Sequence, residues 1–145
     1  DTNAAVDILL ELLLERGISA VRVGNPAKIR VDLRWASLEG RAEASSRGQQ
    51  AATLRVQSEE LRAEAEAGKT ARPPMDGREV GALYAQSREK WKLADTLMEQ
   101  ALTNALEGSH VVMCTCSGAA SALLEPYRYR VVLIDEATQA TEPST

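Results

Sequence analysis

The chain of 145 residues contains no phenylalanine, and aromatic residues make up only 3% of it. Alanine and aliphatic side chains must therefore fill the interior, which favours helices because alanine and leucine are strong helix formers. Only two cysteines occur, Cys114 and Cys116, so a framework of disulfides is excluded. We accordingly expect the protein to reside in a reducing compartment.

The sequence also lacks long apolar runs and any excess of positive charge. No run reaches membrane-spanning length, and the N-terminus has no signal-peptide pattern, so we predict no membrane partner. The formal net charge is −4, so any binding of nucleic acid must be local and directed at its backbone. With one histidine, His110, and closely spaced cysteines, a zinc site is not expected.

Helix and strand signals follow each other in the order of α/β units. Apolar spacing predicts a helix over 4–16, ended by Gly17, and then a strand over 18–23. Further apolar runs predict strands over 110–114 and 131–135. This order predicts a parallel sheet with helical crossovers.

Between 27 and 108 the sequence is rich in helix formers and in charges of both signs. The proline-rich break over 72–77 divides this region. Behind it, an amphipathic pattern that includes Trp91 predicts a helix over 78–107, and a weaker helix upstream could lie antiparallel to it. We predict an α/β core in two parts, 1–26 and 109–145, with 27–108 inserted as a helical hairpin.

The run from Val131 to Ile134 leads directly into Asp135 and Glu136. Such a run predicts a parallel strand buried on both faces, and open α/β sheets bind ligands beyond the carboxyl ends of their strands. One carboxylate there can help to hold Mg²⁺, and its neighbour can position or deprotonate a water. The alternative is an ordinary acidic surface loop, but the residues that follow, Ala137-Thr138-Gln139, favour catalysis.

The tripeptide Gly68-Lys69-Thr70 imitates the end of a phosphate-binding loop. The first glycine of that motif is replaced by Ala63, no strand precedes it, and two glutamates lie in the spacer. We therefore interpret these residues as a helix end followed by a loop.

Two weaker signals concern phosphate groups. Thr2 and Asn3 stand at a helix start, where they can cap the helix or help to bind an anion. Thr115 stands at the end of a predicted strand, where its hydroxyl could bond a nucleic-acid backbone.

Four blocks of the sequence together resemble superfamily 1 helicases. The resemblance is to the branch that contains the nonsense-mediated-decay helicase, the immunoglobulin-mu-binding helicase and senataxin-like proteins. The blocks occur in the family's order: Asp1-Thr2-Asn3-Ala4-Ala5-Val6-Asp7, Arg22-Val23-Gly24-Asn25-Pro26-Ala27-Lys28-Ile29, Val112-Met113-Cys114-Thr115-Cys116-Ser117-Gly118-Ala119 and Val132-Leu133-Ile134-Asp135-Glu136-Ala137-Thr138-Gln139-Ala140-Thr141-Glu142-Pro143.

The resemblance implies part of the first RecA-like motor domain, with ATP and Mg²⁺ as cofactors. The location stays open between cytoplasmic and nuclear. It implies that Asp135 coordinates Mg²⁺ with the ATP phosphates and that Glu136 activates the attacking water. Gln139 is implied to link the nucleotide site to strand movement.

For single-stranded RNA or DNA, the resemblance implies backbone contacts by Thr2, Asn3 and Thr115. It also implies that the helical insertion lies against the nucleic acid. Apart from the resemblance, the insertion is a possible binding site for protein partners. Two other interpretations remain open. The chain could be a non-catalytic helical module for protein interaction, or a metal-dependent hydrolase that uses Asp135 and Glu136 without a nucleotide.

The family's phosphate-binding loop is expected upstream of Asp1, and its second motor domain downstream of Thr145. We therefore expect an internal piece of a longer protein. Because phosphoryl transfer depends on positioning by all of these parts, the isolated 145 residues should hydrolyse no ATP. A phosphate-release assay on the isolated fragment checks this prediction. It would be contradicted if the fragment hydrolysed ATP and the Glu136→Gln variant did not.

Overall fold

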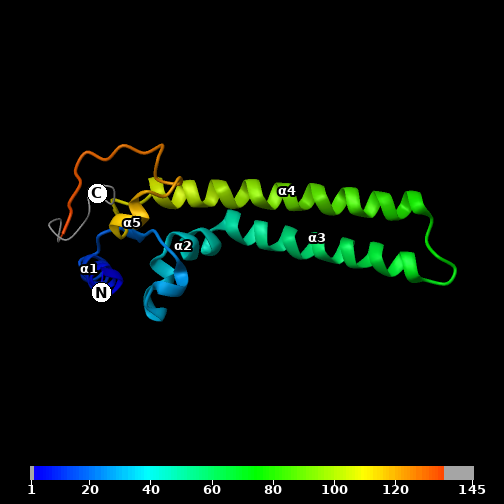
Figure 1. Cartoon of the computed structure of the whole chain (residues 1–145), viewed down its shortest axis with the longest axis horizontal. Coiled ribbons are helices and arrows are strands. Elements are labelled where there is room, and N and C mark those ends of the chain that lie inside the picture. Colours follow the sequence, from blue (N-terminus) through cyan, green and yellow to red (C-terminus); the bar gives the residue numbers. More distant parts are fainter. Residues whose placement is uncertain (1, 136–145) are drawn as a thin grey trace. The chain divides into compact units, whose positions relative to one another are not determined.

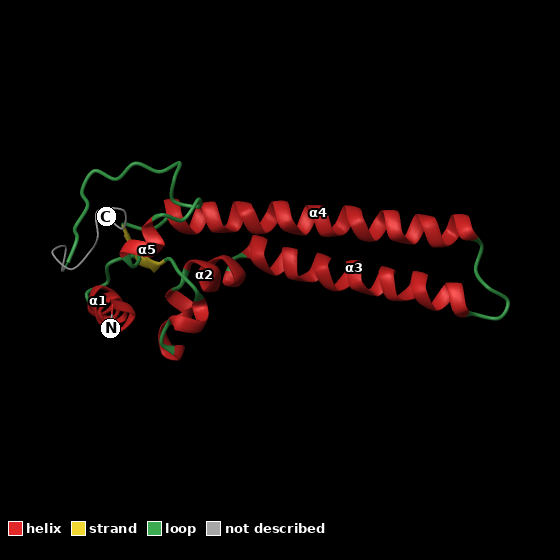
Figure 2. Ribbon diagram, in the orientation of Figure 1, coloured by secondary structure: helices red, strands yellow, loops and turns green. Residues whose placement is uncertain are grey.

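A computed structural model describes residues 2–135 of the chain (Figure 1). It is mostly helical, with one small parallel sheet (Figure 2). The chain divides into two compact units. The first contains the residues up to Gly40 together with those from Leu106 onward, and the second is Arg41–Ala105. Within the described residues, no helix has both the length and the apolar character that crossing a membrane requires.

The first unit begins with helix α1, Thr2–Glu15. The predicted stop at Gly17 is confirmed, because this glycine has a φ of 72° in the left-handed region. The amide of Gly17 donates to the carbonyl of Leu14 at 2.9 Å, and that of Ile18 donates to the carbonyl of Leu13 at 3.0 Å. These two bonds satisfy carbonyls at the end of the helix and turn the chain into strand β1, Ala20–Arg22.

Strand β1 pairs in parallel with β2, Val111–Met113, as the sequence predicts. In this register Arg22 lies opposite Met113, and the amide of Val23 extends the ladder by donating to the Met113 carbonyl at 2.8 Å. On its other edge β1 forms a single bridge from Arg22 to Ser37. The carboxyl ends of both strands therefore lie at one edge of the sheet.

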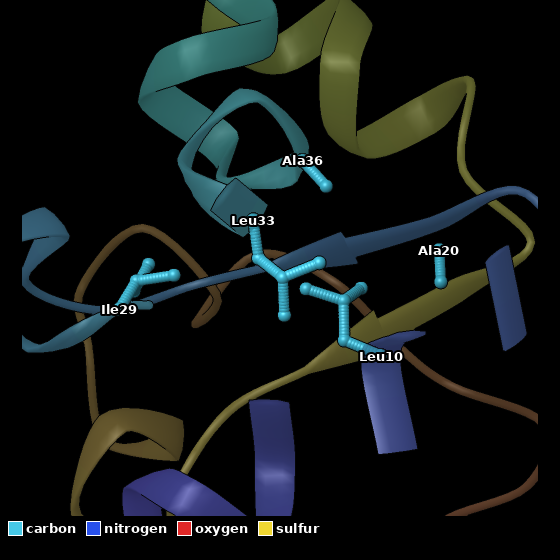
Figure 3. Close-up of a cluster of buried hydrophobic side chains, with 5 residues drawn as sticks. All are labelled: Leu10, Ala20, Ile29, Leu33 and Ala36. Atoms are coloured by element: carbon cyan, nitrogen blue, oxygen red, sulfur yellow. The ribbon is translucent and has the colours of Figure 1, made fainter. Parts of the chain in front are cut away.

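The core of the first unit is a cluster of small and aliphatic side chains. In Figure 3 the side chains of Leu10 and Leu33 point toward each other. Ile29, Leu33 and Ala36 in this cluster come from the stretch that contains two 3₁₀ helices, η1 (Pro26–Lys28) and η2 (Val31–Ala36). The stretch from 27 to 40, which the sequence predicts to belong to the helical insertion, thus packs in the first unit.

The predicted strand over 131–135 is wrong for this structure. Val131 to Ile134 form no strand, and their side chains are exposed, with Leu133 at 92%. A strand this apolar needs neighbouring strands at its edges and layers over its faces. Within residues 2–135 the sheet has only two strands, and neither pairs with this segment.

The second unit is built on two long helices, α3 (Ser46–Thr70) and α4 (Gly77–Glu107). They run antiparallel and side by side, and the predicted break near 72–77 lies between them (Figure 1). Ser58 and Ser87 set their register, since each hydroxyl donates to the other residue's carbonyl at 2.8 Å. A short helix, α2 (Leu38–Ala44), precedes α3.

Small side chains repeat every seven residues along both helices of this pair. A spacing of seven residues is typical of coiled coils, and small residues let two helix backbones approach closely. The repeat comprises Ala51, Ser58 and Ala65 on α3 and Val80, Ser87, Ala94 and Ala101 on α4, all buried.

Trp91 does not belong to this packed face, contrary to the sequence prediction. It is 43% exposed, and the guanidinium of Arg55 lies 5.5 Å from the centre of its ring. The buried small residues at which α3 and α4 meet, here called the small-residue seam, leave no room for an indole. The ring therefore lies on the outer surface of the helix pair.

The small-residue seam predicts an asymmetry between two neighbouring alanines. Ala51→Leu should destabilise the protein by about 1–3 kcal/mol, because the larger side chain forces the helices apart. Ala52→Leu introduces the same atoms at an exposed position and should change stability by less than about 0.5 kcal/mol. Urea unfolding followed by circular dichroism measures the stability of both variants. Equal losses of stability would contradict the close packing of α3 against α4 at Ala51.

Candidate functional site

A buried arginine joins the start of α1 to the sheet. Arg22 is only 1% exposed, although it is charged. Its Nη2 donates to Oδ1 of Asn3 at 2.9 Å, and its Nε lies 2.8 Å from Oδ1 of Asp7. The contact with Asp7 is an ion pair whose angle is not that of a hydrogen bond. Arg22 thus holds two side chains that lie one turn apart on α1.

Asp7 extends this network to the segment that follows β1. Its second oxygen, Oδ2, accepts a hydrogen bond from the backbone amide of Arg30 at 3.0 Å. The carboxylate therefore connects α1, β1 and the chain between the two 3₁₀ helices.

The sequence interpretation missed the pairing of Asp7 with Arg22. Two signals could have revealed it. Asp7 lies three residues before the core residue Leu10, on the same helical face, and Arg22 stands between Val21 and Val23 in a buried strand. A carboxylate on the core-facing side of a helix and a guanidinium in a buried strand predict an ion pair, because charged side chains are almost never fully buried without a partner.

Thr115 stands where β2 leads into the short helix α5, Cys116–Ala119. Its Oγ1 accepts from the amide of Gly118 at 3.1 Å, which leaves the hydroxyl proton available to donate. A Cβ on Gly118 would come within 3.2 Å of that Oγ1, so the glycine permits this tight turn.

The structure brings two of the predicted nucleic-acid residues to one edge of the sheet. Asn3 bonds Arg22 at the carboxyl end of β1, and Thr115 follows Met113, which lies opposite Arg22 in β2. This is the edge where parallel α/β sheets bind their ligands.

The structure does not bring the acidic motif to that edge through a strand. Asp135 lies in an exposed turn after the unpaired segment, and Glu136 and Gln139 lie outside the described residues. Within residues 2–135 no cluster of three metal-binding side chains occurs. The donor chemistry still fits Mg²⁺, which proteins bind through one or two carboxylates together with substrate phosphates.

The Gly68-Lys69-Thr70 sequence is a helix end, as predicted. The ammonium of Lys69 contacts the Tyr84 hydroxyl at 2.7 Å and lies near the Glu66 carboxylate. A lysine engaged by its own helical unit in this way is not arranged to bind a nucleotide.

The sequence profile of the family described as "AAA domain" matches residues 1–145. The chain belongs to this family. Its named relatives place it among the superfamily 1 helicases of the nonsense-mediated-decay branch, which confirms the resemblance of the four sequence blocks. No solved structure matches the chain.

Two of these helicase relatives illustrate the match. "DNA polymerase alpha-associated DNA helicase A" of Schizosaccharomyces pombe is 33% identical over 142 residues, which cover 98% of this chain and 21% of that protein. "Regulator of nonsense transcripts 1 homolog" of Arabidopsis thaliana is 43% identical over 65 residues, which cover 45% of this chain and 5% of that protein. The chain thus spans about a fifth or less of the length of these relatives.

Partial burial at the sheet edge predicts that the thiol of Cys114 is alkylated slowly. Removal from water raises the pKa of Cys114, with the Arg22 charge opposing and Cys116 reinforcing the shift. At pH 8 Cys114 should therefore hold less thiolate than an unperturbed cysteine and react more slowly with iodoacetamide. Mass spectrometry of alkylated peptides from pH 7 to 10 measures this, with free cysteine as the control. Alkylation of Cys114 as fast as free cysteine would contradict the prediction.

Proposed function

We propose that this chain forms part of the first RecA-like motor domain of an ATP-dependent helicase that moves along single-stranded RNA or DNA. One observation carries the proposal. The AAA domain family, whose named relatives here are helicases, matches residues 1–145, and Asn3 and Thr115 lie near the carboxyl ends of two parallel strands, where α/β sheets generally bind ligands.

The nucleic-acid contacts of this motor would be made by Thr2, Asn3 and Thr115. Uncharged side chains of this kind bond phosphate and sugar oxygens, which fixes the position of the strand without reading its sequence. Such contacts suit a chain that is acidic overall, because they need no broad basic surface.

The nucleotide contacts would be made by the acidic motif. Asp135 would hold Mg²⁺, which neutralises charge that develops on the ATP phosphates. Glu136 would orient the attacking water and accept its proton, and Gln139 would link this site to the nucleic-acid strand. Asp135 is exposed on the surface of the first unit.

The helical unit Arg41–Ala105 would be the insertion that lies against the nucleic acid. A second function is favoured by its exposed apolar side chains Val56, Trp91 and Leu93, which suit a protein partner. In that case the chain would act as a helical interaction module, and the acidic motif would have no catalytic role.

One substitution in the full-length protein distinguishes the motor from the module. Glu136→Gln keeps the size of the side chain but removes the base, so ATP turnover should fall by about 10²- to 10⁴-fold while ATP binding stays intact. Steady-state turnover and nucleotide titration measure the two quantities. Glu125→Gln, an exposed acid in the same unit, is the matched control and should leave both unchanged. Unaltered turnover in Glu136→Gln would refute the assignment.

A further inference from the structure

We propose that Arg22 is a positioning residue for nucleic-acid binding, which acts by fixing the orientation of the Asn3 side chain. The inference rests on the proposed function, in which Asn3 contacts the strand. Arg22 itself would touch no ligand, since its side chain is only 2% exposed.

The geometry of the guanidinium supports this role. Its planar group carries donors in fixed directions and has no acceptor. Nε faces Asp7 and Nη2 faces Asn3, so the ion pair with Asp7 determines where Nη2 points. Asp7 is held in turn by the amide of Arg30. The network therefore fixes the point at which the Asn3 side chain is held.

Only one orientation of the Asn3 amide is compatible with this neighbour. Beside a group that only donates, Asn3 must present its oxygen, as the 2.9 Å bond from Nη2 shows. The amide nitrogen is then directed away from the guanidinium. An amide nitrogen donates two hydrogen bonds, and phosphate oxygens accept them, so this is the orientation that suits a nucleic-acid backbone.

Energetics also favour a positioning role over a purely stabilising one. A buried ion pair is often no more stabilising than apolar residues of similar size, because both charges lose their hydration. The Nη1 of Arg22 adds to this cost, since it is buried without a hydrogen bond among the described residues. That unpaired donor is also the feature that would favour direct contact with a phosphate, so the experiment must separate the two roles.

The test is a double-mutant cycle in the full-length protein, with binding of fluorescent oligo(U) and oligo(dT) as the readout. Asn3→Ala should weaken binding by about 2- to 10-fold, the effect of one hydrogen bond. Arg22→Lys keeps the charge, but a lysine cannot hold Asp7 and Asn3 in the same fixed geometry, so binding should weaken similarly. Arg22→Lys combined with Asn3→Ala should bind no more weakly than Asn3→Ala alone.

A matched control is Arg30→Lys. Arg30 forms ion pairs with Glu11 and Asp32 on the surface of the same unit, and its backbone amide still bonds Asp7 in the variant. Oligonucleotide affinity should not change. If thermal unfolding shows that Arg22→Lys is not folded, Asp7→Glu replaces it, because it keeps a charge beside Arg22 but displaces the carboxylate that orients the guanidinium. Its effect should likewise vanish in the Asn3→Ala background.

The salt dependence separates positioning from direct contact. Asn3 is neutral and releases no counterion, so Arg22→Gln should weaken binding without changing the slope of log Kd against log salt concentration. A slope reduced by about 1 would show that Arg22 meets a phosphate itself and would overturn the inference.

The other outcomes are equally decisive. Additive effects of Arg22→Lys and Asn3→Ala would overturn the positioning role while leaving the helicase proposal intact. An Asn3→Ala variant with unchanged affinity would remove Asn3 from the interface and the inference with it. Failure of the full-length wild-type protein to bind either oligonucleotide would refute the proposed function itself.

Discussion

The ion pair between Asp7 and Arg22 is the interaction on which the first unit depends. It joins α1 to β1, and through the amide of Arg30 it joins both to the 3₁₀ segment. Because both charges are buried, removal of either partner alone would leave the other unpaired away from water, which costs about 3–5 kcal/mol. The pair therefore fixes α1 on the sheet more specifically than the small aliphatic core could.

The second unit is held together by a different constraint. Its helices meet through alanine, serine and valine at intervals of seven residues, so stability comes from close backbone approach rather than from large side chains. The reciprocal bonds of Ser58 and Ser87 satisfy two buried hydroxyls and specify one register. The absence of phenylalanine from the sequence is thus compatible with both units, since neither needs a bulky aromatic core.

The sequence predicted those features that local chemistry determines. Gly17 ends α1 because a glycine readily adopts the positive φ that the helix end requires, whatever its surroundings. The break near 72–77 separates α3 from α4 because prolines cannot continue a helix. The pairing of Asp7 with Arg22 could not be predicted from the local pattern of either segment alone, because its two members come from a helix and a strand that only the fold brings together. Trp91 was misplaced, because helical spacing alone does not say how much room the facing helix leaves.

The segment from Val131 to Ile134 shows most clearly where local pattern fails. Its residues have the composition of a buried strand, yet burial depends on neighbours that the segment itself cannot supply. Burying each of these side chains would contribute about 1.5–3 kcal/mol once a strand and a covering layer lie against them. Asp135 comes directly after this run, so in the proposed motor the position of the acidic motif would depend on what covers the run. Asn3, by contrast, is already held by Arg22 within the described residues. In the proposed motor, the buried pair of Asp7 and Arg22 would therefore position the nucleic-acid contact of Asn3 locally. The position of the nucleotide contact at Asp135 would depend on what packs against the preceding apolar run.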